Sequence, residues 1–126
     1  MKYDTKPFRG NIEKITNDNN YYRRVLHTTP QQQLVVMSVE PMQDIPMEKH
    51  TDVSQLIRIE SGNGSAKIGN TTKRLENNTL IVIPPNTYHQ IRNTSKTKSL
   101  KLYSVYSPPQ HLPGTIHKKR EDDPEH

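Results

Sequence analysis

Four side chains in two separate stretches of the sequence are suited to holding a metal ion. Glu48 and His50 lie two residues apart, so an extended strand would direct both toward the same face. Gln55 follows His50 by five residues across a short turn, which would place it on a neighbouring antiparallel segment that faces back toward them. His89 comes 39 residues after His50, directly behind a Pro84-Pro85-Asn86 turn that would fix its backbone. The spacing therefore predicts one site, built from a hairpin and a second strand.

The donor set of this candidate site comprises two imidazoles, one carboxylate and one amide oxygen, which suits a single divalent first-row metal ion. Zinc, manganese, iron and nickel all accept such ligands, and two His with one carboxylate form the set used by non-haem iron sites with open positions. Such spacing also arises by chance. In that case Glu48 and His50 would be exposed turn residues, and His89 an ordinary hydrogen-bonded histidine. The spacing alone leaves both interpretations open.

The elements that must position these residues are short strands. Runs rich in β-branched and aromatic residues alternate with turn signals and give about nine strands over residues 21–106, a pattern typical of an all-β sandwich or barrel. The turn Ser61-Gly62-Asn63-Gly64 is expected to close a hairpin. No helix of useful length is expected. A polar lead-in over residues 1–20 and a Pro-rich tail over residues 107–126, which packs on the barrel and then frays at its end, complete one domain.

Composition narrows the class of protein further. The chain has 126 residues, enough for one domain, and only 29% are hydrophobic, which favours a thin β structure over a helical bundle. Cysteine is absent, so any metal must use nitrogen and oxygen ligands. The net charge of +5 comes from scattered Lys and Arg, with one Phe and no Trp for base stacking, so no nucleic-acid partner is expected. No apolar leader or membrane span is evident, and we expect a cytoplasmic protein without a membrane partner.

The two stretches resemble, in order, the two motifs of the cupins, a superfamily of small jelly-roll barrels. The first motif reads His-x-His, three or four residues, Glu, then six residues to Gly; here it is Glu48-Lys49-His50, four residues, Gln55, then Gly62. The second reads Pro-x-Gly-x-x-His-x-x-x-Asn; here it runs from Pro84 to Asn93 with His89 in place. Three positions depart from the motifs: Glu48 replaces a His, Gln55 replaces the Glu, and Asn86 replaces a Gly, a mild change because Asn tolerates positive φ.

The resemblance covers roughly residues 10–118 and implies a single-domain cupin, a double-stranded β-helix barrel with one metal ion held by Glu48, His50, Gln55 and His89. The chain is most similar to compact, RmlC-like cupins labelled mannose-6-phosphate isomerase-like, including a closing segment that runs from Tyr106 to His117. The true type I isomerases of that name are zinc cupins with Gln, His, Glu and His ligands, so the Gln and Glu are exchanged here. They are also several times longer.

Three functions follow from this resemblance. The first is a metal-dependent isomerase or epimerase that acts on a small polar, sugar-like or sugar-phosphate-like substrate. The second is an oxygen-using enzyme of the dioxygenase type, with Glu48, His50 and His89 as the facial triad and Gln55 as a weak fourth ligand. The third is a non-catalytic cupin that binds a small molecule or acts as a sensor. A homodimer is expected in each case, because cupins commonly pair and an interface would cover apolar positions such as Leu56.

Three further polar residues are assigned simpler roles. His111 and His117 lie six residues apart in the Pro-rich tail and are expected to make ordinary hydrogen bonds, although they could cap the barrel mouth or bind a second ion. Strand alternation places Arg58 opposite Gln55, away from the metal, which indicates a surface or interface role.

Overall fold

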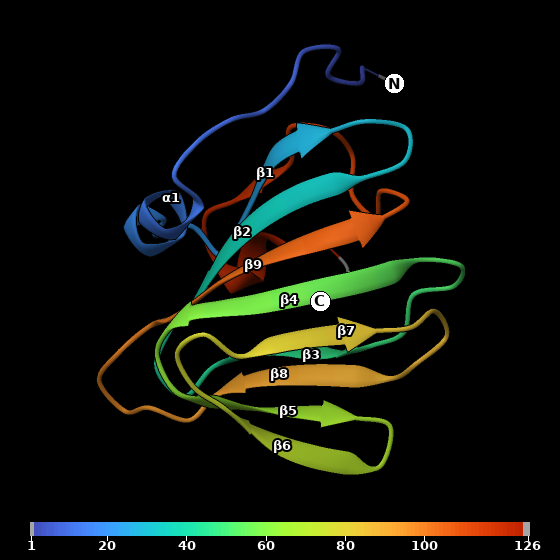
Figure 1. Cartoon of the computed structure of the whole chain (residues 1–126). Helices are drawn as coiled ribbons and strands as arrows, with labels where there is room; N and C mark the ends of the chain where they lie inside the picture. Colours follow the sequence, from blue (N-terminus) through green and yellow to red (C-terminus); the bar gives the residue numbers. More distant parts are fainter. Residues whose placement is uncertain (1, 125–126) are drawn as a thin grey trace.

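Two antiparallel sheets make up most of the computed structural model, which describes residues 2–124. The six-stranded sheet has the order β10-β1-β2-β9-β4-β7, and the four-stranded sheet has the order β3-β8-β5-β6 (Figure 1). The sheets enclose one core, which confirms the predicted all-β jelly-roll barrel. The strands are β1 (Arg23–Thr28), β2 (Gln33–Val39), β3 (Asp44–Glu48), β4 (Ser54–Ser61), β5 (Gly64–Ile68), β6 (Thr71–Leu75), β7 (Leu80–Ile83), β8 (His89–Asn93), β9 (Leu100–Ser107) and β10 (Ile116–His117).

Strand alternation determines which side chains enter the core. In β9 and in most of β4 every second residue is buried, so one face of the six-stranded sheet turns inward and the other outward. Ile57 and Leu102 from this sheet and Ile91 from the opposite sheet are each at most 1% exposed and pack in the same hydrophobic cluster. The expected alternation in β4 is confirmed from Gln55 to Ile59 and breaks at a register shift directly after it.

The turn at residues 61–64 changes sheets rather than closing a hairpin, so the predicted hairpin was wrong. β4 pairs with β7 and β9, whereas β5 pairs with β6 and β8. The glycines of this turn allow it to pack closely against neighbouring backbone segments. Gly62 has φ +112°, and a Cβ at Gly64 would lie 2.4 Å from the carbonyl oxygen of Arg92 on β8. Turn-forming residues thus predicted the bend correctly, but they do not specify which strands pair afterwards.

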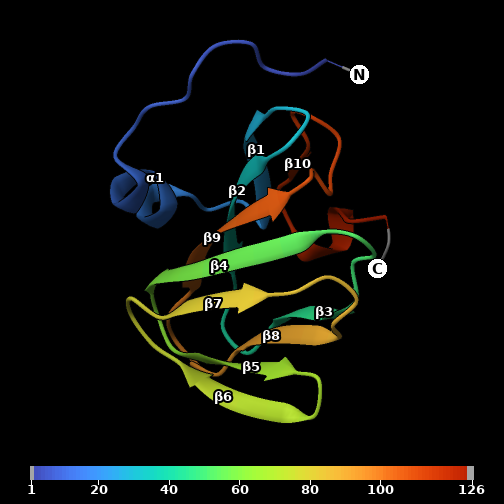
Figure 2. The same ribbon diagram turned by 45° about the vertical axis from the view of Figure 1, so that its right-hand side comes forward.

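A short helix, α1 (Ile12–Asp18), lies within the expected polar lead-in and was not predicted. Asn11 caps it by accepting a hydrogen bond from the Lys14 backbone N–H at 3.0 Å. The helix contacts β2, β4 and β9, and Figures 1 and 2 show it beside the six-stranded sheet. Its one buried residue, Thr16, is polar, and Ile12 and Ile15 are only half-buried, so the apolar stripe is too short to indicate a packed helix.

The C-terminal tail joins the six-stranded sheet through β10, which pairs with β1. Beyond it, Asp123 accepts a hydrogen bond from Arg23 at 2.7 Å, in an ion pair whose side chains are 2% exposed for Arg23 and 5% for Asp123. The fraying predicted for the end of the tail falls on residues 125–126, outside the described residues. Within residues 2–124, no helix has the length and apolar character that crossing a membrane requires.

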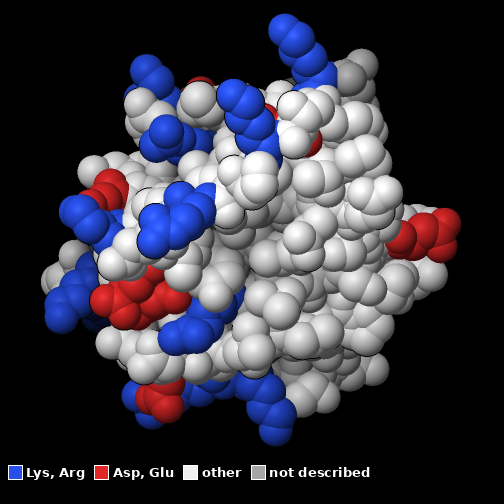
Figure 3. Space-filling model, turned by 45° about the horizontal axis from the view of Figure 1, so that its top comes forward, with Lys and Arg blue, Asp and Glu red and all other residues white. Residues whose placement is uncertain are grey.

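Charged side chains are scattered over the surface. On the face drawn in Figure 3, Lys and Arg lie mostly on the left-hand side and along the edges, with Asp and Glu among them, and a broad area toward the right carries neither. That face shows no continuous basic stripe of the kind that follows a phosphate backbone.

Candidate metal centre

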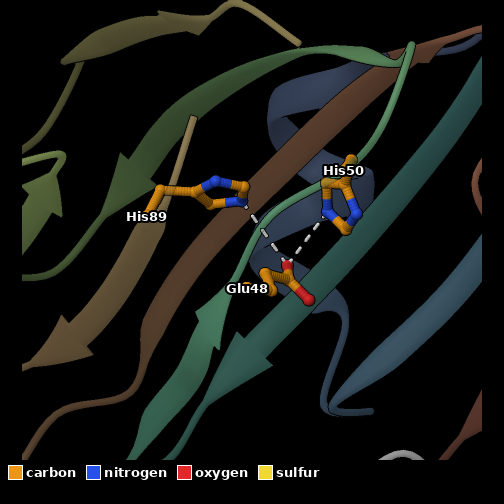
Figure 4. A group of neighbouring side chains, drawn as sticks. All are labelled: Glu48, His50 and His89. Atoms are coloured by element: carbon orange, nitrogen blue, oxygen red, sulfur yellow. Dashed lines mark ion pairs between the residues drawn. The ribbon is translucent and has the colours of Figure 1, made fainter. Parts of the chain in front are cut away.

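Glu48, His50 and His89 meet at one end of the barrel (Figure 4). Glu48 ends β3 and is paired in register with His89, the first residue of β8, and His50 lies two residues beyond Glu48. Glu48 Oε1 lies 3.2 Å from His50 Nε2 and 3.6 Å from His89 Nε2. The three ligand atoms all lie within 4.8 Å of one another, close enough to share one ion. The predicted convergence of these three residues is therefore confirmed.

Local backbone structure fixes the two imidazoles relative to each other. Asn86 has φ +63°, the left-handed conformation expected from its place in the Pro84-Pro85-Asn86 turn. Its backbone N–H donates to the carbonyl oxygen of His50 at 2.8 Å, so the turn before His89 is tied directly to the other half of the site. His89 Nδ1 lies 2.9 Å from the carbonyl oxygen of Thr87, and this contact orients the ring and leaves Nε2 facing Glu48.

Burial and hydrogen bonding show that these residues fit a metal ion. His50 is 8% exposed and His89 is 2% exposed, yet neither Nε2 makes a hydrogen bond. Buried polar atoms in proteins are nearly always hydrogen-bonded, so two imidazole nitrogens whose nearest polar neighbour is one shared carboxylate oxygen, 3.2 and 3.6 Å away, fit a cation that all three would bind. Burial by itself would raise the pKa of Glu48, but the two imidazoles outweigh it and hold that pKa well below its usual range. The carboxylate is thus charged and able to bind a cation.

Gln55 reaches the interior from the other sheet, because β3 and β4 do not pair. The predicted single hairpin was therefore wrong: the chain crosses from one sheet to the other between His50 and Gln55. The Gln55 amide donates from Nε2 to Ser104 Oγ and to the Tyr106 hydroxyl, both at 3.2 Å. Its carbonyl oxygen Oε1 is buried without a hydrogen-bond partner. Two hydroxyls thus orient the amide with its oxygen available, while its role as a fourth ligand stays a prediction.

Tyr106 and His111 are part of this end of the barrel. The Tyr106 side chain is 1% exposed and points inward. Its ring centroid lies 5.8 Å from that of His50 and 5.2 Å from that of His111, and both contacts are edge-to-face. His117, by contrast, makes the expected ordinary contact, 3.0 Å from Nδ1 to the Arg23 guanidinium.

Arg58 lies away from the site, as predicted. Its guanidinium donates to the Asn78 side chain at 2.9 Å, and strand alternation directs it outward from β4. Among residues 2–124, Glu48, His50 and His89 form the one cluster of three or more His, Cys, Asp or Glu side chains with metal-site geometry.

A double-sheet barrel with a Glu-His-His cluster that could hold a metal ion at one end places the chain in a class of small β-barrels, and comparison with known proteins identifies the family. The cupin domain model matches residues 35–106, so the chain belongs to the cupin family and the resemblance in its two motifs is confirmed. The chain is similar to the crystal structure of BH2720 from Bacillus halodurans, with a TM-score of 0.91, 36% identity and coverage of 94% of this chain and 93% of that one.

Two curated proteins are also similar to this chain in sequence. A protein of Acanthamoeba polyphaga mimivirus is 49% identical over 113 residues, which are 87% of this chain and 71% of the relative. YrkC of Bacillus subtilis is 40% identical over 126 residues, covering 95% of this chain and 67% of YrkC. These likenesses establish family and fold, whereas the chemistry must be argued from the site.

Proposed function

We propose that this cupin is a metal-dependent enzyme of the isomerase or epimerase type that acts on a small polar, sugar-like molecule. Glu48, His50 and His89 would hold one divalent ion, with Gln55 as the fourth ligand. When bound, the ion would supply Lewis-acid chemistry by polarising a carbonyl or hydroxyl oxygen. One observation carries the metal assignment: the Nε2 atoms of His50 and His89 are buried, make no hydrogen bond and face the same carboxylate oxygen.

The protein's own contribution is a rigid and nearly dry setting for those donors. The register pairing of Glu48 with His89 and the hydrogen bond from Asn86 to His50 hold the donors on backbone that is already paired. Tyr106 and Ser104 accept the Gln55 N–H bonds and so fix the direction of its amide. Fixed donors cost little reorganisation when a ligand arrives, which is how metal sites keep their geometry through a reaction.

A second candidate function is an oxygen-using iron enzyme. The observation that favours it is the composition of the cluster, since two His and one carboxylate form the facial triad of non-haem iron oxygenases. In that case Gln55 would be a weak ligand or none, and the bound metal would be redox-active iron. Purified protein that contains iron and consumes oxygen in the presence of a substrate would favour this candidate over the isomerase.

We also propose that the natural partner is a small molecule and not a nucleic acid. The mixed charges in Figure 3 support this, because a nucleic-acid backbone is bound by Lys and Arg side chains that contact several phosphates in succession. The nearly buried donors of the metal centre support it as well, since they would accept only a ligand that enters the barrel.

Elemental analysis tests the metal assignment. Protein purified without chelators or a histidine tag should contain about one transition-metal ion per chain, and the His50→Ala and His89→Ala variants should each lose most of it while remaining folded. His27→Ala is the matched control, because His27 contacts the Lys6 carbonyl oxygen and the Phe8 ring, apart from the site. Metal content that stays at the wild-type level in both site variants would refute the proposal. Turnover assays with sugar-like carbonyl compounds then test the reaction.

A further inference from the structure

The imidazole of His111 lies against Tyr106, next to the metal centre, and the segment that carries it is tightly held. A single side chain, Gln33, holds the segment that carries it. Gln33 is fully buried, its Nε2 donates to the His111 carbonyl oxygen at 2.8 Å, and its Oε1 accepts the backbone N–H groups of His111 at 2.9 Å and of Gln110 at 3.2 Å. A second donation, to Thr28 Oγ1 at 3.0 Å, fixes the other side of the Gln33 amide.

The Gln33 contacts hold the backbone of His111 and do not involve its side chain. The backbone of His111 is satisfied through Gln33, but its side-chain Nε2 is buried and makes no hydrogen bond. Burial lowers the pKa of His111 to about 4, aided by the nearby Arg23 charge, so the ring is neutral near pH 7. A neutral imidazole with a buried, unpaired nitrogen is equipped to bind a polar group of a ligand.

The rings connect His111 to the metal centre. Tyr106 contacts His50 on one side and His111 on the other, with centroid distances of 5.8 Å and 5.2 Å, so the two imidazoles are at most about 11 Å apart. A molecule of a few heavy atoms that binds the metal through one end could therefore reach His111 with its other end.

We propose that His111 is a ligand-binding residue of the metal centre, which contacts through Nε2 the distal polar group of a small molecule whose other end coordinates the metal through oxygen. This inference rests on the proposed metal site and adds a substrate class to it: a short compound with polar oxygens at both ends. His111 selects that length, because a molecule with a single polar end satisfies the metal and leaves Nε2 unpaired.

Two probes of different length test this inference on the Co²⁺-loaded protein. Malonate carries a second carboxylate that extends beyond the one that binds the metal and is available to His111, whereas acetate has none. Binding of each is followed by the visible absorption of Co²⁺. In His111→Phe, which retains a ring beside Tyr106 but no nitrogen, malonate should bind about tenfold more weakly and acetate within about twofold of wild type, since one hydrogen bond to a charged group is lost. His111→Gln should recover part of the malonate affinity, and His27→Phe should behave as wild type.

A measurement on the wild-type protein covers the case in which the variant does not fold. In the Zn²⁺-loaded protein with ¹⁵N-labelled histidine, malonate should shift the His111 Nε2 resonance and acetate should not. Equal malonate affinity in His111→Phe and wild type, loss of metal from His111→Phe, or an unchanged Nε2 resonance would each overturn the inference, and none of them would contradict the proposed metal site of the wild-type protein. Failure of the wild-type protein to take up Co²⁺ would instead overturn the proposed function together with this inference.

Discussion

Metal binding to the Glu48, His50 and His89 cluster should stabilise the fold by an amount that can be calculated. At a free-metal concentration 100 times Kd, a ligand that binds only the native state stabilises it by about 2.7 kcal/mol. For a chain of 126 residues the entropy of unfolding is about 0.26 kcal/mol per degree, so Tm should rise by about 10 °C. The assay is thermal unfolding followed by circular dichroism, first with chelator and then with added Zn²⁺ or Mn²⁺.

His89→Ala is the decisive variant for this prediction. If loss of one imidazole ligand weakens binding 100-fold, the same metal concentration stabilises the variant by only about 0.4 kcal/mol, a rise below about 2 °C. Removing a buried ring also lowers the starting Tm, but the measured quantity is the change on adding metal, so that cost does not enter. His27→Ala should retain the full rise. Equal metal-induced shifts in wild type and His89→Ala would refute the assignment of His89 as a ligand.

Four further outcomes are expected. Burial lowers the pKa of His111 from 6.5 to about 4, so the unfolded chain takes up a proton at His111 before the folded protein does. The free energy of unfolding should therefore fall by up to about 3 kcal/mol as pH drops from 6.5 to 4. Urea unfolding of His111→Phe should lack that loss. The pKa of Glu48 lies below its usual 4.5, so the stabilising contribution of its charge is present above pH 4.5 and is lost as pH falls further. The unfolding free energy of Glu48→Gln should therefore depend less on pH below 4.5 than that of wild type. An equal pH dependence of the two proteins would contradict this. Gly64→Ala should destabilise the fold more than Gly69→Ala, because it adds a Cβ 2.4 Å from a backbone oxygen of β8. A Cβ at Gly69 meets no atom within 4 Å, so that variant carries only the penalty of a left-handed backbone, about 1–2 kcal/mol. Similar urea midpoints for the two variants would count against this. We propose that the half-buried Leu56 on the outer face of β4 lies in a homodimer interface, so Leu56→Glu should convert a dimer to a monomer in light scattering, and a wild-type monomer would end that proposal.

The convergence of the site was predictable because it depends on strand geometry. Glu48 and His50 are two residues apart in extended backbone, and this spacing directs both toward the same face. Asn86 marks the turn before His89 and adopts the positive φ that such a residue tolerates. These features are local, so the sequence contains them directly. Their meeting across two strands, with Glu48 opposite His89, required the family resemblance in addition.

The partners of each strand could not be predicted, because pairing is a long-range property. The turn at residues 61–64 has the residues of a tight hairpin, yet it leads β5 to the opposite sheet. The same ambiguity placed Gln55 in a hairpin with Glu48, although it comes from the other sheet and is held by Ser104 and Tyr106. Residues of a turn restrict φ and ψ locally. They carry no information on which of several apolar strands the chain meets next, which is decided by burial over the whole barrel.

The role of Gln33 and His111 was hidden for a related reason. Gln33 begins a strand whose apolar residues decide its position, and a single polar residue at that point reads as an exposed strand end. Its role becomes visible only in the folded chain, where the backbone of His111, 78 positions away, hydrogen-bonds to the Gln33 amide. A buried amide that makes hydrogen bonds on both sides restrains the tail. It follows that Gln33→Ala should release His111 from Tyr106 and weaken malonate binding as His111→Phe does, while the metal, held by donors on β3, on β8 and in the segment directly after β3, should stay bound. Loss of the metal from Gln33→Ala would mean that the tail and the metal centre are one structural unit and not two.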